Sequence, residues 1–142
     1  MNREENQVVI YWDASAILSA LIRDAHSDEA QEWVRKEGAH LLSSLAYAEV
    51  LAVLFRMKRE RAMADVLVEA ALEALDRGPW RELNPMPTWG HMVELSKRWS
   101  LRGADLWHLS AAKSVSEHLP EVRVLTFDAR LRVAAQGEGL GL

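Results

Sequence analysis

Short apolar runs alternate with longer amphipathic segments along this chain. The first run, Val8 to Trp12, is rich in β-branched residues and has polar neighbours on both sides, a pattern typical of a buried strand in a parallel sheet. Shorter runs predict further strands at His40 to Ser43, at Trp80 to Asn84 and at Val122 to Phe127. The pattern therefore predicts strands that are separated by long connections.

Longer segments with helical features fill these connections. Ser27 is a good N-cap residue, and the acidic residues after it and the basic residues at Arg35 and beyond complement a helix dipole. Gly38 is a natural residue just past the end of that helix, and Gly78 with Pro79 ends another. The chain predicts helices over Ala16 to Ile22, Asp28 to Glu37, Leu45 to Arg59, Arg61 to Asp76, Trp89 to Ser100, Ala104 to Glu117 and Ala129 to Ala135.

The alternation of strands with helices predicts an α/β fold with a parallel sheet and helices on both faces. The chain has 142 residues, of which 49% are hydrophobic, and this is enough for a real core. Nothing in the sequence resembles a linker, a repeat or a low-complexity tract. We therefore expect a single domain over residues 1–142, a three-layer α/β/α sandwich with a short, mainly parallel sheet.

Composition bears on location. The chain contains no cysteine, which excludes disulfides, a thiolate zinc site and a cysteine nucleophile. The residues Met1 to Asn6 are polar and lead into a strand, so they do not form a secretory signal. The uncharged apolar stretches are far shorter than the roughly 20 residues that a membrane-spanning helix requires. We expect a cytoplasmic protein without a membrane partner.

The formal net charge of −4 at first argues against a nucleic-acid partner. However, setting aside four acidic candidates among the 21 acidic residues leaves 17, which equals the number of Lys and Arg residues. One or two divalent cations in the pocket would offset the negative charge of those four and attract phosphate. Charge therefore neither proves nor excludes a nucleic-acid substrate.

Four acidic residues end or interrupt apolar segments: Asp13, Glu49, Asp105 and Asp128. A carboxylate among core residues is costly to bury unless a partner charge, hydrogen bonds or a metal ion compensates it. Asp13 and Asp128 follow predicted strands, at the carboxyl ends where functional residues gather in α/β folds, and Asp105 opens a predicted helix. The set favours convergence on one cation-binding pocket, and therefore a metal-dependent enzyme.

Each of these residues also has an ordinary structural interpretation. Asp13 and Asp128 could cap the helices that follow them, and the helix dipole favours Asp105 at a helix N-terminus. Glu49 could pair with a nearby arginine. The coincidence of all four, rather than any one of them, favours the metal site.

Other classes of function fit the sequence less well. A phosphatase with Asp13 as nucleophile needs a second aspartate two residues later, where this chain has Ser15. A receiver domain needs a lysine near the end of a late strand, and none is found there. A module that only binds RNA or protein would gain nothing from clustered negative charge.

The segments around the four acidic residues resemble the motifs of the PIN-domain nucleases, and most closely those of VapC-like toxins of bacterial toxin–antitoxin pairs. Asp13-Ala14-Ser15 is similar to the family's opening motif, and Ala48-Glu49-Val50 to the glutamate motif of its third helix. Ala104-Asp105-Leu106 resembles the third motif and Thr126-Phe127-Asp128 the last. The resemblance covers essentially the whole chain, in order and at suitable spacing.

This resemblance implies a Mg²⁺- or Mn²⁺-dependent endoribonuclease. Both ions seek oxygen ligands and retain water, so a few carboxylates and a substrate phosphate suffice to bind them. By the resemblance, Asp13, Asp105 and Asp128 are the principal ligands, and Glu49 completes the ligand set or orients the attacking water. Ser15 and Thr126 are expected to hold carboxylates in place by hydrogen bonds.

Candidate substrate contacts lie near these residues. The basic run at the end of the Leu45 to Arg59 helix could follow an RNA backbone, or it could be a solvated helix end. Tyr11-Trp12 is a bulky lead-in to Asp13 for this family, and Trp107 stands where a small residue is commoner and could line the pocket. His108, three residues after Asp105, could touch the substrate or a ligand carboxylate, or be a packed or surface residue. The candidates are Arg56, Lys58, Arg59, Trp107 and His108.

The resemblance also implies partners. In VapC-like proteins a pair of helices forms a groove for the antitoxin, and subunits commonly dimerise. The apolar residues Leu51, Leu54, Phe55, Val66 and Leu67 exceed what one helical face needs. We therefore expect a homodimer and a small antitoxin protein, with RNA as substrate. An RNA-processing nuclease outside a toxin–antitoxin pair, and a catalytically silent PIN-like module, remain the alternatives.

Overall fold

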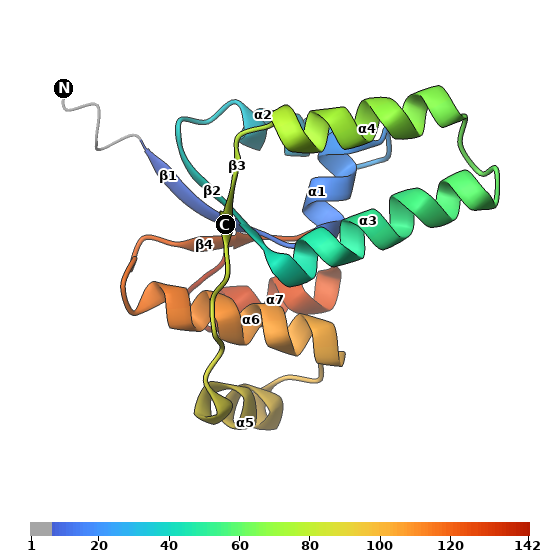
Figure 1. The fold of residues 1–142 in the computed structure, drawn as a ribbon. Helices are drawn as coiled ribbons and strands as arrows, with labels where there is room; N and C mark the ends of the chain where they lie inside the picture. The colour runs from blue at the N-terminus through green and yellow to red at the C-terminus, as the bar shows by residue number, and fades with distance from the viewer. Residues whose placement is uncertain (1–6) are drawn as a thin grey trace.

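The computed structural model describes residues 7–142 and contains four strands and seven helices in this part of the chain (Figure 1). The polar stretch Met1 to Asn6 lies outside the described residues. The strands are β1 (Val8–Trp12), β2 (Gly38–Ser43), β3 (Trp80–Leu83) and β4 (Arg123–Leu125). The helices are α1 (Ala14–Leu21), α2 (Ser27–Val34), α3 (Ser44–Arg59), α4 (Asp65–Arg77), α5 (Trp89–Arg98), α6 (Gly103–Ser116) and α7 (Ala129–Gly137).

The strands form one sheet in the order β3-β2-β1-β4, and each neighbouring pair is parallel. Tyr11 of β1 pairs with Leu41 on one side and with Val124 on the other. β1 is therefore a central strand, as its continuous apolar run predicts. The parallel arrangement brings the carboxyl ends of β1 and β4 to the same edge of the sheet.

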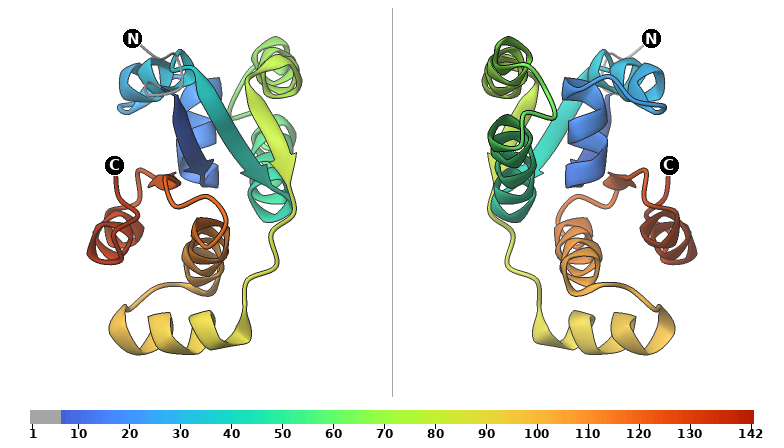
Figure 2. Two further views of the ribbon diagram at one scale, coloured as in Figure 1. Left: turned by 90° about the vertical axis from the view of Figure 1, so that its left-hand side faces the viewer. Right: turned by 90° about the vertical axis from the view of Figure 1, so that its right-hand side faces the viewer.

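Helices cover both faces of the sheet, which confirms the predicted α/β/α sandwich. Figure 1 shows α1 to α4 on its upper side and α5 to α7 on its lower side, and Figure 2 shows the same division from two other directions. Successive strand residues face opposite layers: Trp12 packs with Ile17 and Val50 in the first layer, and Tyr11 packs with Leu109 and Leu131 in the second. Among residues 7–142, no helix combines the length and apolar character needed to cross a bilayer.

The predicted N-cap role of Ser27 is wrong. α2 begins at Ser27 itself, and the cap position belongs to His26, whose side chain makes no capping hydrogen bond. The Ser27 hydroxyl donates to the carbonyl of Ile22 at 3.0 Å and accepts from the backbone N–H of Asp24 at 2.8 Å. The hydroxyl therefore closes the turn before the helix instead of capping it.

Gly38 has a different role from the one predicted. α2 ends at Val34, before the predicted Glu37, and Gly38 is the first residue of β2 with φ of +142°. A Cβ atom at this position would lie 2.0 Å from the carbonyl oxygen of Val8. Glycine is thus required by the close approach of two strands, not by the end of a helix.

The predicted helix start at Arg61 is also wrong, because α4 begins only at Asp65. Arg61 has φ of +53°. Its N–H donates to the carbonyl of Lys58 at 3.2 Å, and the N–H of Ala62 donates to the carbonyl of Met57 at 2.9 Å. This pair of hydrogen bonds is a Schellman motif at the end of α3, and it interrupts the helical path.

Candidate active site

Asp13 is a buried carboxylate that ends β1 and caps α1. It is 3% exposed. Its Oδ1 atom accepts hydrogen bonds from the N–H of Ala16 at 2.9 Å and from the hydroxyl of Ser15 at 2.7 Å, and its Oδ2 atom accepts one from the hydroxyl of Thr126. Burial raises the pKa of Asp13, and the hydrogen bonds from Thr126, Ser15 and Ala16 oppose this rise. The cap predicted from sequence is present, and the carboxylate has further partners beyond it.

The same two hydroxyls tie the end of β4 to the start of α1. The N–H of Phe127 donates to Oγ of Ser15 at 3.0 Å, and the N–H of Asp128 donates to Oγ1 of Thr126 at 3.1 Å. β4 accordingly ends at Leu125 rather than at the predicted Phe127, because Thr126 and Phe127 turn toward these hydroxyls. Ser15 and Thr126 thus connect the segments that carry Asp13 and Asp128.

Asp128 and Asp105 each stand at the start of a helix. Oδ1 of Asp128 accepts from the N–H of Leu131 at 3.0 Å and caps α7, while Asp105 lies in the first turn of α6. Burial, followed by the negative charge of Asp128, raises the pKa of Asp105; Glu49 adds to the rise, whereas His108 opposes it. The structure therefore brings Asp105, Asp128 and Glu49 into one negative field.

Glu49 forms its hydrogen bond with a histidine and not with an arginine, which was the structural alternative that its sequence context allowed. Nε2 of His108 lies 2.6 Å from Oε1 of Glu49, and Nδ1 of the same ring lies 2.7 Å from the hydroxyl of Tyr11. His108 is 1% exposed, so its ring is packed in the interior, and both of its nitrogens already have partners that are not substrate. Of the roles open to it, the structure selects contact with a candidate carboxylate.

Trp107 lies at the edge of this region. Its ring meets the ring of His108 edge-on, with centroids 5.6 Å apart. It also lines an open hollow of about 500 Å³ together with Ser44, Leu45, Gly103 and Ala104. The hollow lies between the N-terminal ends of α3 and α6, next to the turn that carries Asp105.

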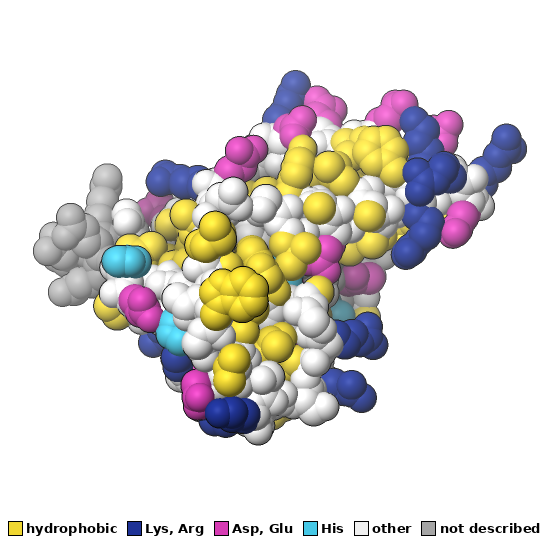
Figure 3. All heavy atoms as spheres, turned by 60° about the horizontal axis from the view of Figure 1, so that its bottom comes forward, with side chains coloured by type: hydrophobic (Ala, Val, Ile, Leu, Met, Phe, Trp, Pro, Cys, Tyr) yellow, Lys and Arg dark blue, Asp and Glu magenta, His cyan; other side chains and the backbone are white. Residues whose placement is uncertain are grey.

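The basic candidates lie farther along α3. Arg56 follows Glu49 by seven residues, and the helical rise of 1.5 Å per residue separates them by roughly 10 Å along the axis. Arg56, Lys58 and Arg59 occupy the last turn of α3, where Figure 3 shows Lys and Arg side chains gathered at one end of the molecule. They flank the carboxylates at a distance and do not contact them.

The donor set suits a hard divalent cation, since its members are carboxylate oxygens. In the part of the chain that the structure describes, no three Asp, Glu or His side chains stand close enough to hold an ion together. Magnesium keeps several waters and needs only one or two direct carboxylates, so water-bridged binding satisfies this geometry. Burial raises the pKa of both Asp13 and Asp105, and a bound cation would favour their ionised forms. The residues present therefore fit such an ion.

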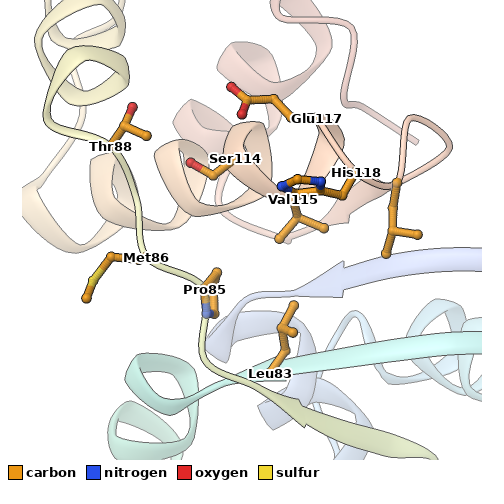
Figure 4. A pocket seen from close by; sticks show the side chains of 9 residues that line it. Leu83, Pro85, Met86, Thr88, Ser114, Val115, Glu117 and His118 are labelled. Atoms are coloured by element: carbon orange, nitrogen blue, oxygen red, sulfur yellow. The ribbon is translucent and has the colours of Figure 1, made fainter.

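A second hollow lies away from the carboxylates. It measures about 360 Å³ and lies between the segment after β3 and the C-terminal end of α6. Figure 4 shows Pro85 and Leu83 on one side of it, and Val115 and His118 on the other. Its lining is mostly apolar and contains none of Asp13, Glu49, Asp105 and Asp128, so it is not the candidate active site.

Tyr11 belongs to this site although its sequence context gives no sign of it beyond the bulk of the Tyr11-Trp12 pair before Asp13. The alternation of a strand places Tyr11 opposite Trp12, on the face that α6 covers, and His108 lies one helical turn after Asp105. These two periodicities are the signal that connects them, but only the packing of α6 on β1 reveals the contact.

Comparison with known proteins identifies relatives over most of the chain. The model of the family described as the PIN domain matches residues 10–137. The chain is 31% identical over 136 residues to ribonuclease VapC45 and to ribonuclease VapC49 of Mycobacterium tuberculosis, covering 92% of this chain and 92% of each relative. Ribonuclease VapC46 of the same organism is 30% identical over 133 residues, covering 94% of this chain and 95% of the relative.

Two solved structures have a similar fold. The crystal structure of PAE2754 from Pyrobaculum aerophilum matches with a TM-score of 0.60 and 20% identity, over 92% of this chain and 81% of that one. The crystal structure of Mycobacterium tuberculosis VapC20, described as a sarcin-ricin loop cleaving toxin, matches with a TM-score of 0.58 and 18% identity, over 88% and 94%. At these identities the likeness concerns the fold alone.

Proposed function

This chain belongs to the PIN domain family, and we propose that it is a divalent-metal-dependent endoribonuclease that hydrolyses RNA phosphodiester bonds. The relatives that are ribonucleases align with nearly its full length. The observation that carries the proposal is the buried carboxylate of Asp13, which Ser15 and Thr126 hold beside the segment that carries Asp128. The charges of Asp128 and Glu49 act in addition on Asp105. Such an arrangement is costly without a cation and useful with one.

In this proposal Asp13, Asp105 and Asp128 hold Mg²⁺ or Mn²⁺, directly or through water. When bound, such an ion polarises the scissile phosphate and makes water a better nucleophile for in-line displacement. Ser15 and Thr126 keep the Asp13 carboxylate in one orientation by donating hydrogen bonds to it. Glu49 completes the ligand set or orients the attacking water.

The basic end of α3 is proposed to contact the RNA backbone through Arg56, Lys58 and Arg59. Cationic side chains bind phosphates without regard to sequence and in a salt-dependent manner. Trp107, beside the hollow next to Asp105, is proposed to contact the substrate near the cleaved bond, because RNA-binding proteins stack unpaired bases on aromatic rings. We also propose that residues 1–142 act as one domain, since both helical layers pack on a single sheet.

We propose further that the protein is the toxin of a toxin–antitoxin pair, that it forms a homodimer and that a small antitoxin protein binds it. Phe55, Val66 and Leu67 on α3 and α4 are 41%, 69% and 56% exposed, and apolar side chains exposed together favour an interface. Leu54 is wholly buried, so the expectation that it contributes to an interface is wrong. Light scattering of Leu67→Asp beside the wild type tests the dimer.

A pool of short RNA oligonucleotides of random sequence, incubated with the full chain in Mg²⁺, Mn²⁺ or EDTA, tests the enzymatic proposal. We expect cleavage with either metal and none in EDTA, and loss of cleavage in Asp128→Asn. Asp76→Asn is the matched control, because it makes the same change at an exposed residue of α4. Cleavage that persists in EDTA, or a control as inactive as Asp128→Asn, would contradict the proposal. Growth arrest on expression, relieved by a small protein encoded next to it, would support the toxin role.

A further inference from the structure

Tyr11, His108 and Glu49 form a continuous chain of hydrogen bonds from the sheet to the candidate active site. The Tyr11 hydroxyl lies 2.7 Å from Nδ1 of His108, and Nε2 of the same ring lies 2.6 Å from Oε1 of Glu49. The three residues belong to β1, α6 and α3, so the chain joins the sheet to both helical layers. We call these three hydrogen-bonded residues the tyrosine–histidine–glutamate chain.

The burial of the three side chains differs along the chain. Tyr11 is wholly buried and His108 is 1% exposed, whereas the side chain of Glu49 keeps 35% of its surface exposed. The interior end is therefore fixed by packing, and the Glu49 end opens toward the candidate active site. A hydrogen bond from a packed ring to a half-exposed carboxylate restricts the rotation of that carboxylate.

The chemistry of the three groups sets the direction of the hydrogen bonds. An ionised carboxylate only accepts, so Nε2 of His108 carries the proton that lies between the ring and Glu49. The Tyr11 hydroxyl can donate to a bare Nδ1 or accept from a protonated one. Nε2 therefore donates to Glu49 whether the ring is neutral or charged, and the direction does not depend on the charge of the histidine.

The tyrosine–histidine–glutamate chain also lies beside the other carboxylates of the candidate site. Tyr11 is two residues before Asp13 on the same strand segment, and His108 is one helical turn after Asp105. Burial raises the pKa of both Asp13 and Asp105, and the nearby ring of His108 opposes that rise. A displacement of the His108 ring would therefore change the electrostatic environment of Asp13 and Asp105 as well as the hydrogen bond to Glu49.

We infer that Tyr11 and His108 are positioning residues whose hydrogen-bonded chain holds Glu49 in the orientation that RNA cleavage requires. This inference rests on the proposed ribonuclease function. It assigns the hydrogen bond from Nε2 of His108, rather than the bulk of the ring, as the feature that Glu49 needs. It also gives Tyr11 a role in the reaction although the hydroxyl is out of reach of any substrate.

Two substitutions of His108 separate this hydrogen bond from packing. In His108→Gln the side-chain amide nitrogen can take the place of Nε2 and donate to Glu49, whereas in His108→Asn the shorter amide reaches only to the place of Nδ1. We expect kcat for one RNA oligonucleotide cleaved by the wild type to fall roughly 10- to 100-fold in His108→Asn and by less than about fivefold in His108→Gln. KM should stay within about twofold in both, because neither side chain touches the substrate.

Circular dichroism first establishes that both variants are folded. Equal losses of kcat in the two folded variants, or a loss expressed in KM alone, would overturn the inference. Tyr11→Phe, which removes the hydroxyl and keeps the ring, should lower kcat by roughly tenfold, and an unchanged kcat in this variant would likewise contradict a role for Tyr11.

A measurement on the wild type keeps the inference independent of activity. Nitrogen-15 NMR of the labelled full chain reports which ring nitrogen of His108 carries a proton. We expect a proton on Nε2, and a bare Nε2 with a proton only on Nδ1 would overturn the inference. Absence of any RNA cleavage by the wild type would contradict the proposed function instead, and the protonation of Nε2 would then decide the hydrogen-bonded chain alone.

Discussion

The hydroxyl of Thr126 donates a hydrogen bond to Oδ2 of Asp13, a residue 113 positions earlier in the chain. This hydrogen bond joins the segment after β4 to the end of β1. It also offsets part of the desolvation cost of the Asp13 carboxylate, which is almost fully buried. Because an ionised carboxylate in such a place depends on its donors, this hydrogen bond links the stability of the fold to the charge of the candidate site.

Replacing Thr126 by Val removes this donor and nearly keeps the shape of the side chain. We expect the free energy of unfolding at neutral pH to fall by about 1–3 kcal/mol, since the buried Asp13 loses one of its donors. Urea denaturation measures the change. Thr126→Ser retains the hydroxyl, so its free energy of unfolding should fall by less than that of Thr126→Val. Equal stability of the two variants would contradict the importance of this hydrogen bond.

Divalent cations should stabilise the protein through the same group of carboxylates. Mass action gives about 3 kcal/mol when the free metal is at 100 times its Kd, which a thermal melt in Mg²⁺ or Mn²⁺ against EDTA detects as a higher Tm. In Asp105→Asn the shift should be smaller, because a ligand is lost. In EDTA, however, this variant should melt above the wild type, since it removes a carboxylate whose pKa burial and Asp128 raise. Wild-type melts that do not respond to either metal would count against the site.

Glu138 should make stability depend on acid pH. It accepts hydrogen bonds from Arg98, Trp99 and Lys113, and these interactions, led by the one with Arg98, lower its pKa from 4.5 to about 2. A lowered pKa in the folded state adds stability that is present above 4.5 and is lost as the pH falls toward 2. Allowing for the solvent exposure of the partners, the contribution is about 1–2 kcal/mol.

Denaturation at several pH values tests this expectation. The difference in stability between the wild type and Glu138→Gln should shrink as the pH falls from 5 to 2. Glu73→Gln is the control, because Glu73 forms an exposed ion pair with Arg77 and exposed pairs contribute little. A wild type and a Glu138→Gln variant with parallel pH dependence would contradict the role of Glu138.

Glycine at position 61 should give a more stable protein than the native arginine does. Its φ of +53° lies in the left-handed region that costs residues with a Cβ atom roughly 1 kcal/mol, and glycine is the usual residue at this point of a Schellman motif. We therefore expect Arg61→Gly to raise the free energy of unfolding by up to about 1 kcal/mol. The same substitution at Arg59, the last residue of α3, should lower it, by less than about 1 kcal/mol, because glycine is a poor helix former. A loss of stability in Arg61→Gly would show that the arginine side chain contributes more than the backbone strain costs.

Hydrophobic patterning predicted the layers of this fold because its signals are local. Val8–Trp12 reads as a central strand from its own residues, and the alternation of strands and helices implies a parallel sheet. Ser27 and Arg61 were misassigned because their conformations depend on neighbours in space or on hydrogen bonds that close a turn. Ser27 closes the turn before α2, and Arg61 occupies a left-handed position for which its residue type gives no signal.

The candidate site divides in the same way. Asp13 and Asp128 could be selected because each lies between an apolar strand and a helix, and Asp105 because it stands at the start of a helix with apolar residues after it. The contact between His108 and Glu49 could not be predicted, because the residues lie 59 positions apart and on different helices. Only the packing of α6 against β1 and α3 brings them together, so a close contact of this kind has no signature in the spacing of residues.

The late position of β4 in the chain has a consequence for synthesis. β4 pairs with β1 and comes late in the order of synthesis. A nascent chain that does not yet include β4 can place Asp13 at the end of β1. Such a chain still lacks Thr126, which hydrogen-bonds to Asp13, and Asp128, whose charge acts on Asp105. The four carboxylates of the candidate site can therefore come together only after the segment that carries Thr126 and Asp128 has been synthesised. The proposed ribonuclease gains its full set of carboxylates only after β4 has been made, so a nascent chain that ends before β4 should not cleave the RNA around it.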